Sequence, residues 1–305
     1  MQTSDIRSPA KSIRTWFGGV LPFLKKGIWN SFPHSLVKFR LIYWYGELLH
    51  VLSRLRATWR QNHSTWFFRN RPQLELIRRL THERPHGSTL RIAVLACSNG
   101  AEVYSVLWTI RATRPDLKVT LRAVDISNGI VQIAREGVYR FKASELMPTR
   151  VFERTTQEEM RSIFDSDGDL AKIKTWLKEG IHWQVGDAGD PELLKLLGSQ
   201  DLVIANNFLC IMKPPNAERC LRNLARLVDS GGYLVVSGID LRVRTKVALA
   251  SGWTPVRDLL EEMHDGDPSI RIIWPWKYCG LEPLNKRKAD WKIRYASVFQ
   301  IEHKK

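Results

Sequence analysis

The sequence predicts an α/β protein: a doubly wound, Rossmann-like sheet of parallel strands, with an N-terminal helical region and a small inserted β subdomain. Three observations predict it. From residue 90 onward, short apolar runs alternate with longer segments of helical periodicity, which is typical of parallel strands joined by helices. Gly100 lies in a small-residue turn directly after the first apolar run. Asp125 ends the second run, and such sheets bind ligands at the carboxyl ends of their strands.

The first elements of the core follow from their apolar spacing. A connecting helix is predicted over 72–80 and ends before Pro85, because proline does not continue a helix. The first strand, 90–96, is apolar at successive positions, as a strand covered on both faces requires. In the helix after the turn, Val103 and Leu107 recur at helical spacing.

The rest of the chain continues the alternation. A helix is predicted over 216–228 and another near 244–251, while a terminal strand, 295–301, is expected to close an edge of the sheet. Residues 149–180 interrupt the pattern with a small insertion, in which a turn at 165–168 is predicted to join a hairpin. The hairpin strands are expected at 162–164 and 172–174, and the remaining sheet strands at 119–124, 181–186, 201–206 and 232–237.

The composition divides the chain into a basic N-terminal region, residues 1–60, and a larger domain, residues 61–305. Residues 1–89 hold 15 Lys and Arg against 4 Asp and Glu, a balance of +11 within a total of +16. Such an excess favours an anionic partner. Within residues 13–60, apolar and aromatic side chains recur at helical spacing beside basic ones. One interpretation is that this region docks on an anionic membrane surface or a partner helix. The other is that it forms a helical cap over the larger domain.

Several classes of partner and compartment are disfavoured by the sequence. Nucleic acid is an unlikely partner, because the basic region is also amphipathic and contains no recognisable RNA-binding module. The four cysteines form no C-x-x-C pair and no metal-ligand spacing, so no metal is expected and reduced thiols fit the pattern. The apolar runs are too short for a signal peptide or a membrane span. We therefore expect a cytoplasmic protein, with peripheral attachment to the inner face of the membrane left open.

The turn after the first strand predicts the type of ligand. A pyrophosphate-binding turn carries several glycines, whereas Gly100 stands alone and Glu102 follows it. Glu102 would repel a pyrophosphate and attract an ammonium group, and Asp125 can accept hydrogen bonds from both hydroxyls of a ribose. S-adenosylmethionine carries a ribose and an amino-acid ammonium, so it is the predicted cofactor. The alternative is a plain strand-turn-helix unit in which Asp125 only caps the next helix.

Six short segments follow one another in the order and spacing of a known enzyme family. They are Thr65-Trp-Phe-Phe-Arg69, Cys97-Ser-Asn-Gly-Ala-Glu-Val-Tyr-Ser105, Ala123-Val-Asp-Ile-Ser127, Gly137-Val-Tyr139, Asn206-Asn-Phe-Leu-Cys-Ile-Met212 and Ser230-Gly-Gly-Tyr-Leu234. Through them the chain resembles, from about Ser64 to Gly238, the chemotaxis-receptor (CheR-type) methyltransferases. That family uses S-adenosylmethionine to methylate protein glutamates, so the resemblance implies a methyltransferase fold and the same cofactor.

The resemblance also implies roles for individual residues. Glu102 would bind the cofactor ammonium, beside the turn at Gly100, and Asp125 would bind the ribose hydroxyls. Asp187 stands where the family usually has an asparagine and would contact the adenine amino group, since a carboxylate accepts that bond as well as an amide oxygen does. Arg69 would orient the anionic acceptor and is the predicted catalytic residue. Cofactor-binding roles are further implied for Thr65, Arg69, Asn206 and Asn207.

The chain departs from the family at positions that bear on the substrate. Ala101 and Val103 replace an acid and a proline of the family's loop, and Ile211 stands where the family has a tyrosine near the transferred methyl. Transfer to a carboxylate needs little acid–base help, because that group is already ionised at neutral pH. We therefore expect O-methylation of a carboxylate or hydroxyl on a protein or membrane-associated acceptor. The alternative is a non-catalytic cofactor-binding or scaffold module derived from the same fold.

Overall fold

The computed structural model describes residues 65–141, 151–266, 282 and 284–303. All of them belong to one compact unit, Ser53–Lys305. The predicted N-terminal region, residues 1–60, lies outside the described residues, so its helical character stays a prediction.

The described residues form helices and strands in alternation. The helices are α3 (Arg71–His82), α4 (Ala101–Arg111), α5 (Asn128–Glu136), α6 (Gln157–Ile163), α7 (Thr175–Lys178), α8 (Pro191–Leu197), α9 (Pro214–Leu227), α10 (Leu241–Ser251), α11 (Leu260–Asp265) and α13 (Trp291–Arg294), with the 3-10 turn η2 (Leu209–Ile211). The strands are β1 (Thr89–Leu95), β2 (Lys118–Asp125), β3 (Val138–Arg140), β4 (Phe164–Asp167), β5 (Leu170–Ile173), β6 (Ile181–Val185), β7 (Gln200–Ile204), β8 (Val228–Val235), β9 (Thr254–Pro255) and β10 (Val298–Gln300).

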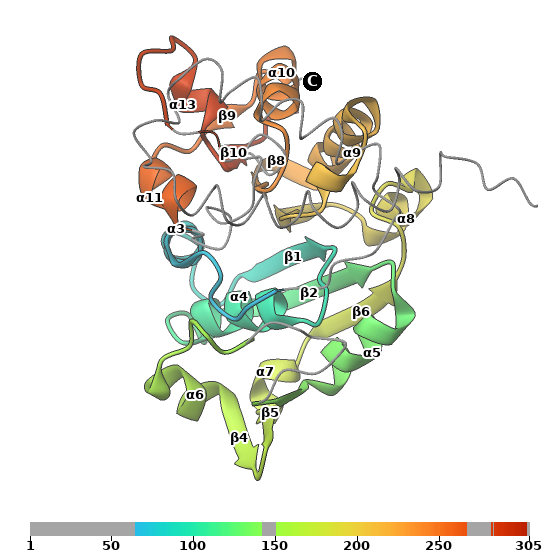
Figure 1. The fold of residues 1–305 in the computed structure, drawn as a ribbon, viewed down its shortest axis with the longest axis vertical. Helices are drawn as coiled ribbons and strands as arrows, with labels where there is room; N and C mark the ends of the chain where they lie inside the picture. The colour runs from blue at the N-terminus through green and yellow to red at the C-terminus, as the bar shows by residue number, and fades with distance from the viewer. Residues whose placement is uncertain (1–64, 142–150, 267–281, 283, 304–305) are drawn as a thin grey trace, which may run out of the picture. The chain divides into compact units, whose positions relative to one another are not determined.

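The main sheet has seven strands in the order β6-β2-β1-β7-β8-β10-β9 (Figure 1). The strands β6, β2, β1, β7 and β8 run parallel to their neighbours, whereas β10 runs antiparallel to both β8 and β9. The predicted α/β fold is therefore confirmed. Because β1 lies between β2 and β7, the connections leave it in opposite directions, and doubly wound sheets bind their ligands at the carboxyl ends of such strands.

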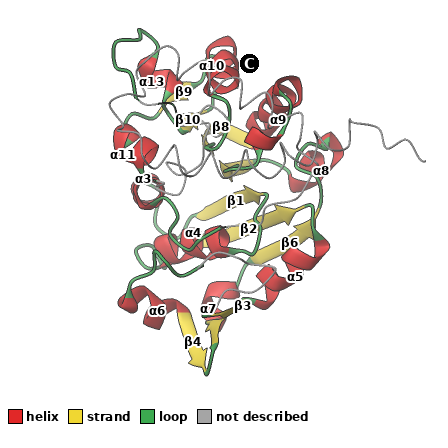
Figure 2. Cartoon of the chain, viewed as in Figure 1, coloured by secondary structure: helices red, strands yellow, loops and turns green. Residues whose placement is uncertain are grey.

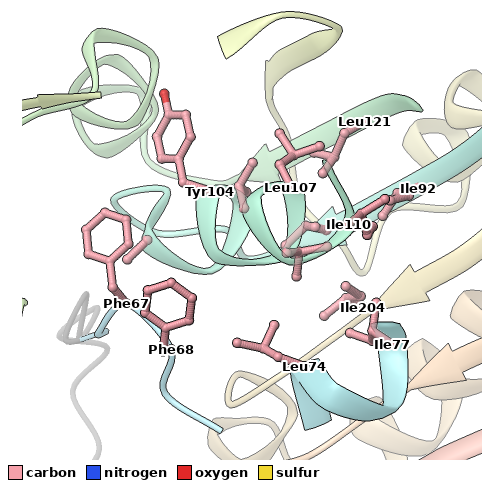
Figure 3. Close-up of a cluster of buried hydrophobic side chains, with 14 of the residues drawn as sticks. Phe67, Phe68, Leu74, Ile77, Ile92, Tyr104, Leu107, Ile110, Leu121 and Ile204 are labelled. Carbon is pink, nitrogen blue, oxygen red and sulfur yellow. The ribbon is translucent and has the colours of Figure 1, made fainter. Parts of the chain in front are cut away.

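Both faces of the parallel strands are covered, with helices on the two sides of the sheet (Figure 2). Ile92 and Val94 of β1 belong to the apolar cluster shared by α3, α4 and the small sheet, part of which Figure 3 shows. Ala93 and Leu95 belong to a second cluster with α8, α9 and α10. Successive residues of a strand point to opposite faces, so β1 must be apolar throughout, as its sequence predicts.

Three predicted elements differ from the structure. The terminal strand, β10, does not close the sheet edge, because the two-residue strand β9 pairs along its outer side. The predicted hairpin strand at 162–164 is wrong for its first two residues, which belong to α6. A capping box between Thr156 and Glu159 begins this helix, so β4 starts only at Phe164. The predicted turn at 165–168 is also wrong for its first three residues, which pair with β5 as part of β4, so the turn lies at 168–169. The small sheet, in the order β3-β5-β4, also takes in β3, which precedes residue 149.

Candidate active site

The carboxyl ends of β1 and β2 meet at Asp125. Its side chain is 5% exposed, and each carboxylate oxygen accepts one backbone hydrogen bond, Oδ2 from Ser98 at 2.8 Å and Oδ1 from Ser127 at 3.1 Å. A carboxylate offers about four lone-pair positions, so both oxygens keep capacity for a further donor. Asp125 is therefore held in one orientation, as the predicted contact with two ribose hydroxyls requires.

The turn between β1 and α4 depends on Gly100. Its φ is +85°, a left-handed conformation that favours glycine. A Cβ at this position would lie only 3.1 Å from both Ala134 Cβ and Trp183 Cη2. The backbone bend therefore requires glycine, and the bend leads directly into the first turn of α4, which carries Glu102.

Glu102 and Asp125 lie at the same end of the sheet. The pKa of the buried Cys97 thiol is raised well above its ordinary value, first by burial and then by the negative charges of Asp125 and Glu102. The Glu102 side chain is partly exposed. Burial raises the pKa of its carboxyl group, while a hydrogen bond from Asn206 and the charge of Arg69 oppose that rise. A partly buried carboxylate of this kind gains from the approach of a cation.

Asn206 holds Glu102 in place from the end of β7. Its Nδ2 donates to Glu102 Oε1 at 2.7 Å, and its Oδ1 accepts from the backbone nitrogen and Oγ of Ser237 at 2.9 and 2.7 Å. Asn206 is buried and contacts Glu102, and its predicted role in binding the cofactor stays a prediction. Asn207 is partly exposed, has a φ of +63°, and donates its backbone N–H to the carbonyl oxygen of Ser237 at 3.0 Å.

The segment before α3 brings Arg69 to Glu102. Phe68 is buried and has a φ of +55°, and its backbone N–H donates to Ser105 Oγ of α4 at 3.0 Å. This contact ties the segment to the helix that carries Glu102. The positive charge of Arg69 lowers the pKa of Glu102. Thr65 is partly exposed and precedes the same segment, and its predicted contact with the cofactor stays a prediction.

Asp187 lies in the loop after β6, next to the end of β2. The backbone N–H of Gly186 donates to the carbonyl oxygen of Asp125 at 2.9 Å, which joins the two strand ends. Asp187 is exposed, and its Oδ1 accepts from the backbone N–H of Gly189 at 2.7 Å. The second oxygen of the carboxylate can accept a hydrogen bond from an adenine amino group, as the sequence predicts.

Gln73 belongs to the same group of side chains, although the sequence did not predict it as a site residue. It is buried in the first turn of α3, and its Oε1 accepts from Asn206 Nδ2 at 2.8 Å. The neighbouring Leu74 and Ile77 are core residues. A polar residue on the buried side of an amphipathic helix was the available signal, and by itself it does not indicate a ligand.

The side chains at the strand ends fit the predicted cofactor. They offer three carboxylates, one guanidinium and the carboxamides of Asn206 and Gln73, which suit ribose hydroxyls, an ammonium, an adenine amino group and a carboxylate. Within the ranges that the structure describes, no group of three or more His, Cys, Asp or Glu side chains could hold a metal ion. Across those same ranges, no helix combines the length and apolar character that crossing a membrane demands.

The raised pKa of Glu102 predicts a pH-dependent affinity for S-adenosylhomocysteine, the demethylated cofactor. Only the ionised carboxylate attracts the ammonium, so the affinity is expected to fall as the pH drops, beginning above the ordinary glutamate pKa of about 4.3. Glu102→Gln is expected to weaken binding roughly tenfold or more at neutral pH and to remove this pH dependence. Isothermal titration calorimetry from about pH 5 to about pH 8 measures both effects.

The raised pKa of Glu102 also predicts how its carboxyl group affects the stability of the ligand-free protein, and this effect has the opposite pH dependence to that of cofactor affinity. A carboxyl group whose pKa is raised on folding stabilises the folded chain below its unfolded pKa, and this contribution is lost as the pH rises through the folded value. Glu102→Gln is therefore expected not to destabilise the ligand-free protein at neutral pH, as thermal unfolding would show. A Glu102→Gln variant whose affinity for S-adenosylhomocysteine still depends on pH would contradict the assignment of Glu102 to the ammonium.

Comparison with known proteins identifies the family. The family described as CheR methyltransferase, SAM binding domain matches residues 63–244. The Chemotaxis protein methyltransferase of Vibrio parahaemolyticus is 28% identical over 186 residues, which cover 59% of this chain and 64% of the relative. The Probable biofilm formation methyltransferase WspC of Pseudomonas aeruginosa is 26% identical over 181 residues, which cover 56% of this chain and 40% of the relative. Each match spans less than two thirds of the relative's length.

Among solved structures, the N-methyltransferase NodS from Bradyrhizobium japonicum, in complex with S-adenosyl-L-homocysteine, aligns with a TM-score of 0.35 and 15% identity. The alignment covers 61% of this chain and 76% of that one, a likeness too slight to add to the assignment. The family match covers more than half of the 305 residues. The chain therefore belongs to the CheR methyltransferase family, and its cofactor is S-adenosylmethionine.

Proposed function

We propose that the protein transfers a methyl group from S-adenosylmethionine to an oxygen atom of a carboxylate or hydroxyl, on a protein or membrane-associated acceptor. When bound, the cofactor supplies an electrophilic methyl group on a positively charged sulfur. Glu102 holds the ammonium and Asp125 the ribose hydroxyls. The observation that supports an anionic acceptor is the charge of Arg69 acting on Glu102, because it indicates a guanidinium at the methionyl end of the site.

Arg69 contributes to catalysis by orienting the acceptor carboxylate rather than by transferring a proton. An acceptor carboxylate is ionised at neutral pH and needs no base to make it a nucleophile. A guanidinium can hold such a carboxylate by two parallel hydrogen bonds, which fixes its plane as well as its position. Arg69 then keeps one acceptor oxygen in line with the methyl group, and this positioning supplies most of the acceleration.

Ile211 points to an acceptor that differs from that of the family. It lies in η2, four residues after Asn207, and its side chain is 48% exposed. The family's tyrosine at this position offers a hydroxyl, whereas isoleucine offers only apolar surface. We therefore propose that the acceptor presents an apolar group at this point of the site.

Transfer to a carboxylate predicts a base-labile product. Incubation with tritiated S-adenosylmethionine and bacterial cell fractions is expected to label a macromolecule and to release the label as methanol in alkali, because methyl esters hydrolyse there and methyl ethers do not. Arg69→Lys is expected to slow the labelling roughly tenfold or more, since lysine cannot make the paired hydrogen bonds. The matched control is Arg135→Lys, on the exposed side of α5, which is expected to label at the wild-type rate.

Each outcome of the labelling experiment has a separate meaning. A base-stable label would assign a hydroxyl acceptor. Label in the membrane fraction would support a cytoplasmic protein that binds the inner membrane surface through residues 13–60, for which the +11 balance of residues 1–89 is the reason. Label in nucleic acid would contradict the proposal, and cofactor binding without any transfer would indicate the non-catalytic module.

A further inference from the structure

A chain of hydrogen bonds with a fixed direction ends at Gln73. The backbone nitrogen of Ser237 can only donate, so the Asn206 atom that it contacts at 2.9 Å must be the amide oxygen. The amide nitrogen of Asn206 then donates to Glu102 Oε1 at 2.7 Å and to the Gln73 side chain at 2.8 Å. Gln73 must therefore present its oxygen to Asn206.

The amide nitrogen of Gln73 is left without a partner by this arrangement. The side chain is 4% exposed, and its Nε2 is buried and makes no hydrogen bond with any part of the chain that the structure describes. Exchanging the nitrogen and oxygen of Gln73 would set two donors against each other at Asn206. Buried donors are nearly always paired in folded proteins. This donor lies two hydrogen bonds away from Glu102, so a ligand held by Glu102 is in a position to supply its partner.

The backbone holds Gln73 in this place before any ligand binds. Its N–H donates to Asn70 Oδ1 at 3.2 Å, which caps the first turn of α3. Asn70 Nδ2 in turn donates to the carbonyl oxygen of Met263 in α11 at 2.9 Å. The position of Gln73 is thus set by contacts outside the cofactor site.

We propose that Gln73 Nε2 donates a hydrogen bond to the α-carboxylate of S-adenosylmethionine, an inference that rests on the proposed contact between Glu102 and the ammonium. In an α-amino acid, both groups are attached to one carbon by bonds of about 1.5 Å each. When the ammonium contacts Glu102, the carboxylate of the same amino acid must therefore lie close to the residues that surround Glu102. Asn206 bridges Glu102 and Gln73, so one amide positions both an acceptor for the cation and a donor for the anion. Gln73 is then a specificity residue for the amino-acid end of the cofactor.

Gln73→Met tests the proposal, because it removes the donor at nearly constant volume. In calorimetric titrations, S-adenosylhomocysteine is expected to bind roughly tenfold more weakly than to the wild type. S-adenosyl-3-thiopropylamine keeps the ammonium but lacks the carboxylate, and its affinity is expected to change by less than about twofold. Equal weakening of both ligands would mean that Gln73 acts only through Glu102. Unchanged binding of both would mean that Nε2 has no ligand partner, and either result overturns the proposal.

The matched control is Gln200→Met. Gln200 is also buried, and its Nε2 donates to the carbonyl oxygen of Leu197 at 2.7 Å, but it begins β7 and therefore lies at the opposite end of this strand from Asn206. This variant is expected to lower the Tm and to leave both affinities unchanged. If Gln73→Met does not fold, Gln73→Glu retains the oxygen that Asn206 requires. The glutamate variant is expected to bind S-adenosylhomocysteine more weakly and the amine equally or more tightly, and the reverse preference would refute the proposal.

The readout is binding alone, so it does not depend on which atom accepts the methyl group. Failure of the proposed contact of Glu102 has its own signature in the same titrations. A wild-type protein that binds S-adenosyl-3-thiopropylamine no better than 5′-methylthioadenosine, which lacks the whole amino-acid end, would refute the ammonium contact and with it the basis for Gln73.

Discussion

Asp125→Asn is expected to weaken the binding of S-adenosylhomocysteine by roughly 100-fold or more. Hydrogen bonds to a charged group contribute about 1.5–3 kcal/mol each, and two ribose hydroxyls lose their charged acceptor. The substitution also sets an amide NH₂ against a backbone donor, because the carboxylate oxygens accept from both Ser98 and Ser127. We therefore expect a loss of about 1–3 kcal/mol in the free energy of unfolding as well. Calorimetry and urea unfolding measure the two effects separately.

The control for Asp125→Asn is Asp165→Asn. The Asp165 side chain is 72% exposed in β4 and lies 4.0 Å from Lys174 Nζ. Exposed ion pairs of this kind contribute little, so we expect the same chemical change to leave cofactor affinity and stability unaltered. An Asp125→Asn variant that bound S-adenosylhomocysteine like the wild type would remove the ribose contact from the site.

Phe67→Ala is expected to cost about 3–5 kcal/mol of stability, as large-to-small changes of buried aromatic residues do. The side chain is fully buried, and its ring centroid lies 5.0 Å from that of Phe164 and 5.2 Å from that of Tyr139. These rings come from the small sheet, so Phe67 joins it to the segment that carries Arg69. We therefore expect methyl transfer to fall together with the Tm, which circular dichroism follows.

Phe141→Ala is the matched control for Phe67→Ala. Phe141 is 42% exposed, and its ring centroid lies 5.4 Å from that of Phe152. Because a large part of its surface is already in contact with water, we expect a loss of less than about 1 kcal/mol. Similar losses in the two variants would show that the aromatic cluster does not hold the small sheet.

The parallel core was predictable because its strands are apolar on both faces and its helices have regular apolar spacing. The predicted strand at 90–96 and the observed β1, Thr89–Leu95, differ by one residue. The strands β3 and β9 were not predicted, because three and two residues show no periodicity. The place of β10 inside the sheet could not be predicted either, since pairing between distant segments leaves no local trace in the sequence.

The site was predictable where a backbone feature determines a side chain's position. Asp125 ends a strand and Glu102 follows a glycine turn, and the structure brings both carboxylates to Cys97. Gln73 was not predictable, because the role proposed for it depends on the direction of a hydrogen bond that begins at Ser237, more than 160 residues away. Such a chain of contacts exists only in the folded protein. The contact predicted for Thr65 stays a prediction.

The inner position of β10 has a consequence for the synthesis of this chain on the ribosome. About 60 residues separate the end of β8 at Val235 from the start of β10 at Val298. At about 5–20 residues per second, translation of that interval takes roughly 3–12 s. Throughout it, the edge of β8 that pairs with β10 in the folded protein has no partner strand from β10, and β9, once synthesised, has none either. Exposed strand edges promote aggregation. We therefore expect a chaperone that binds nascent chains to protect this chain during its synthesis.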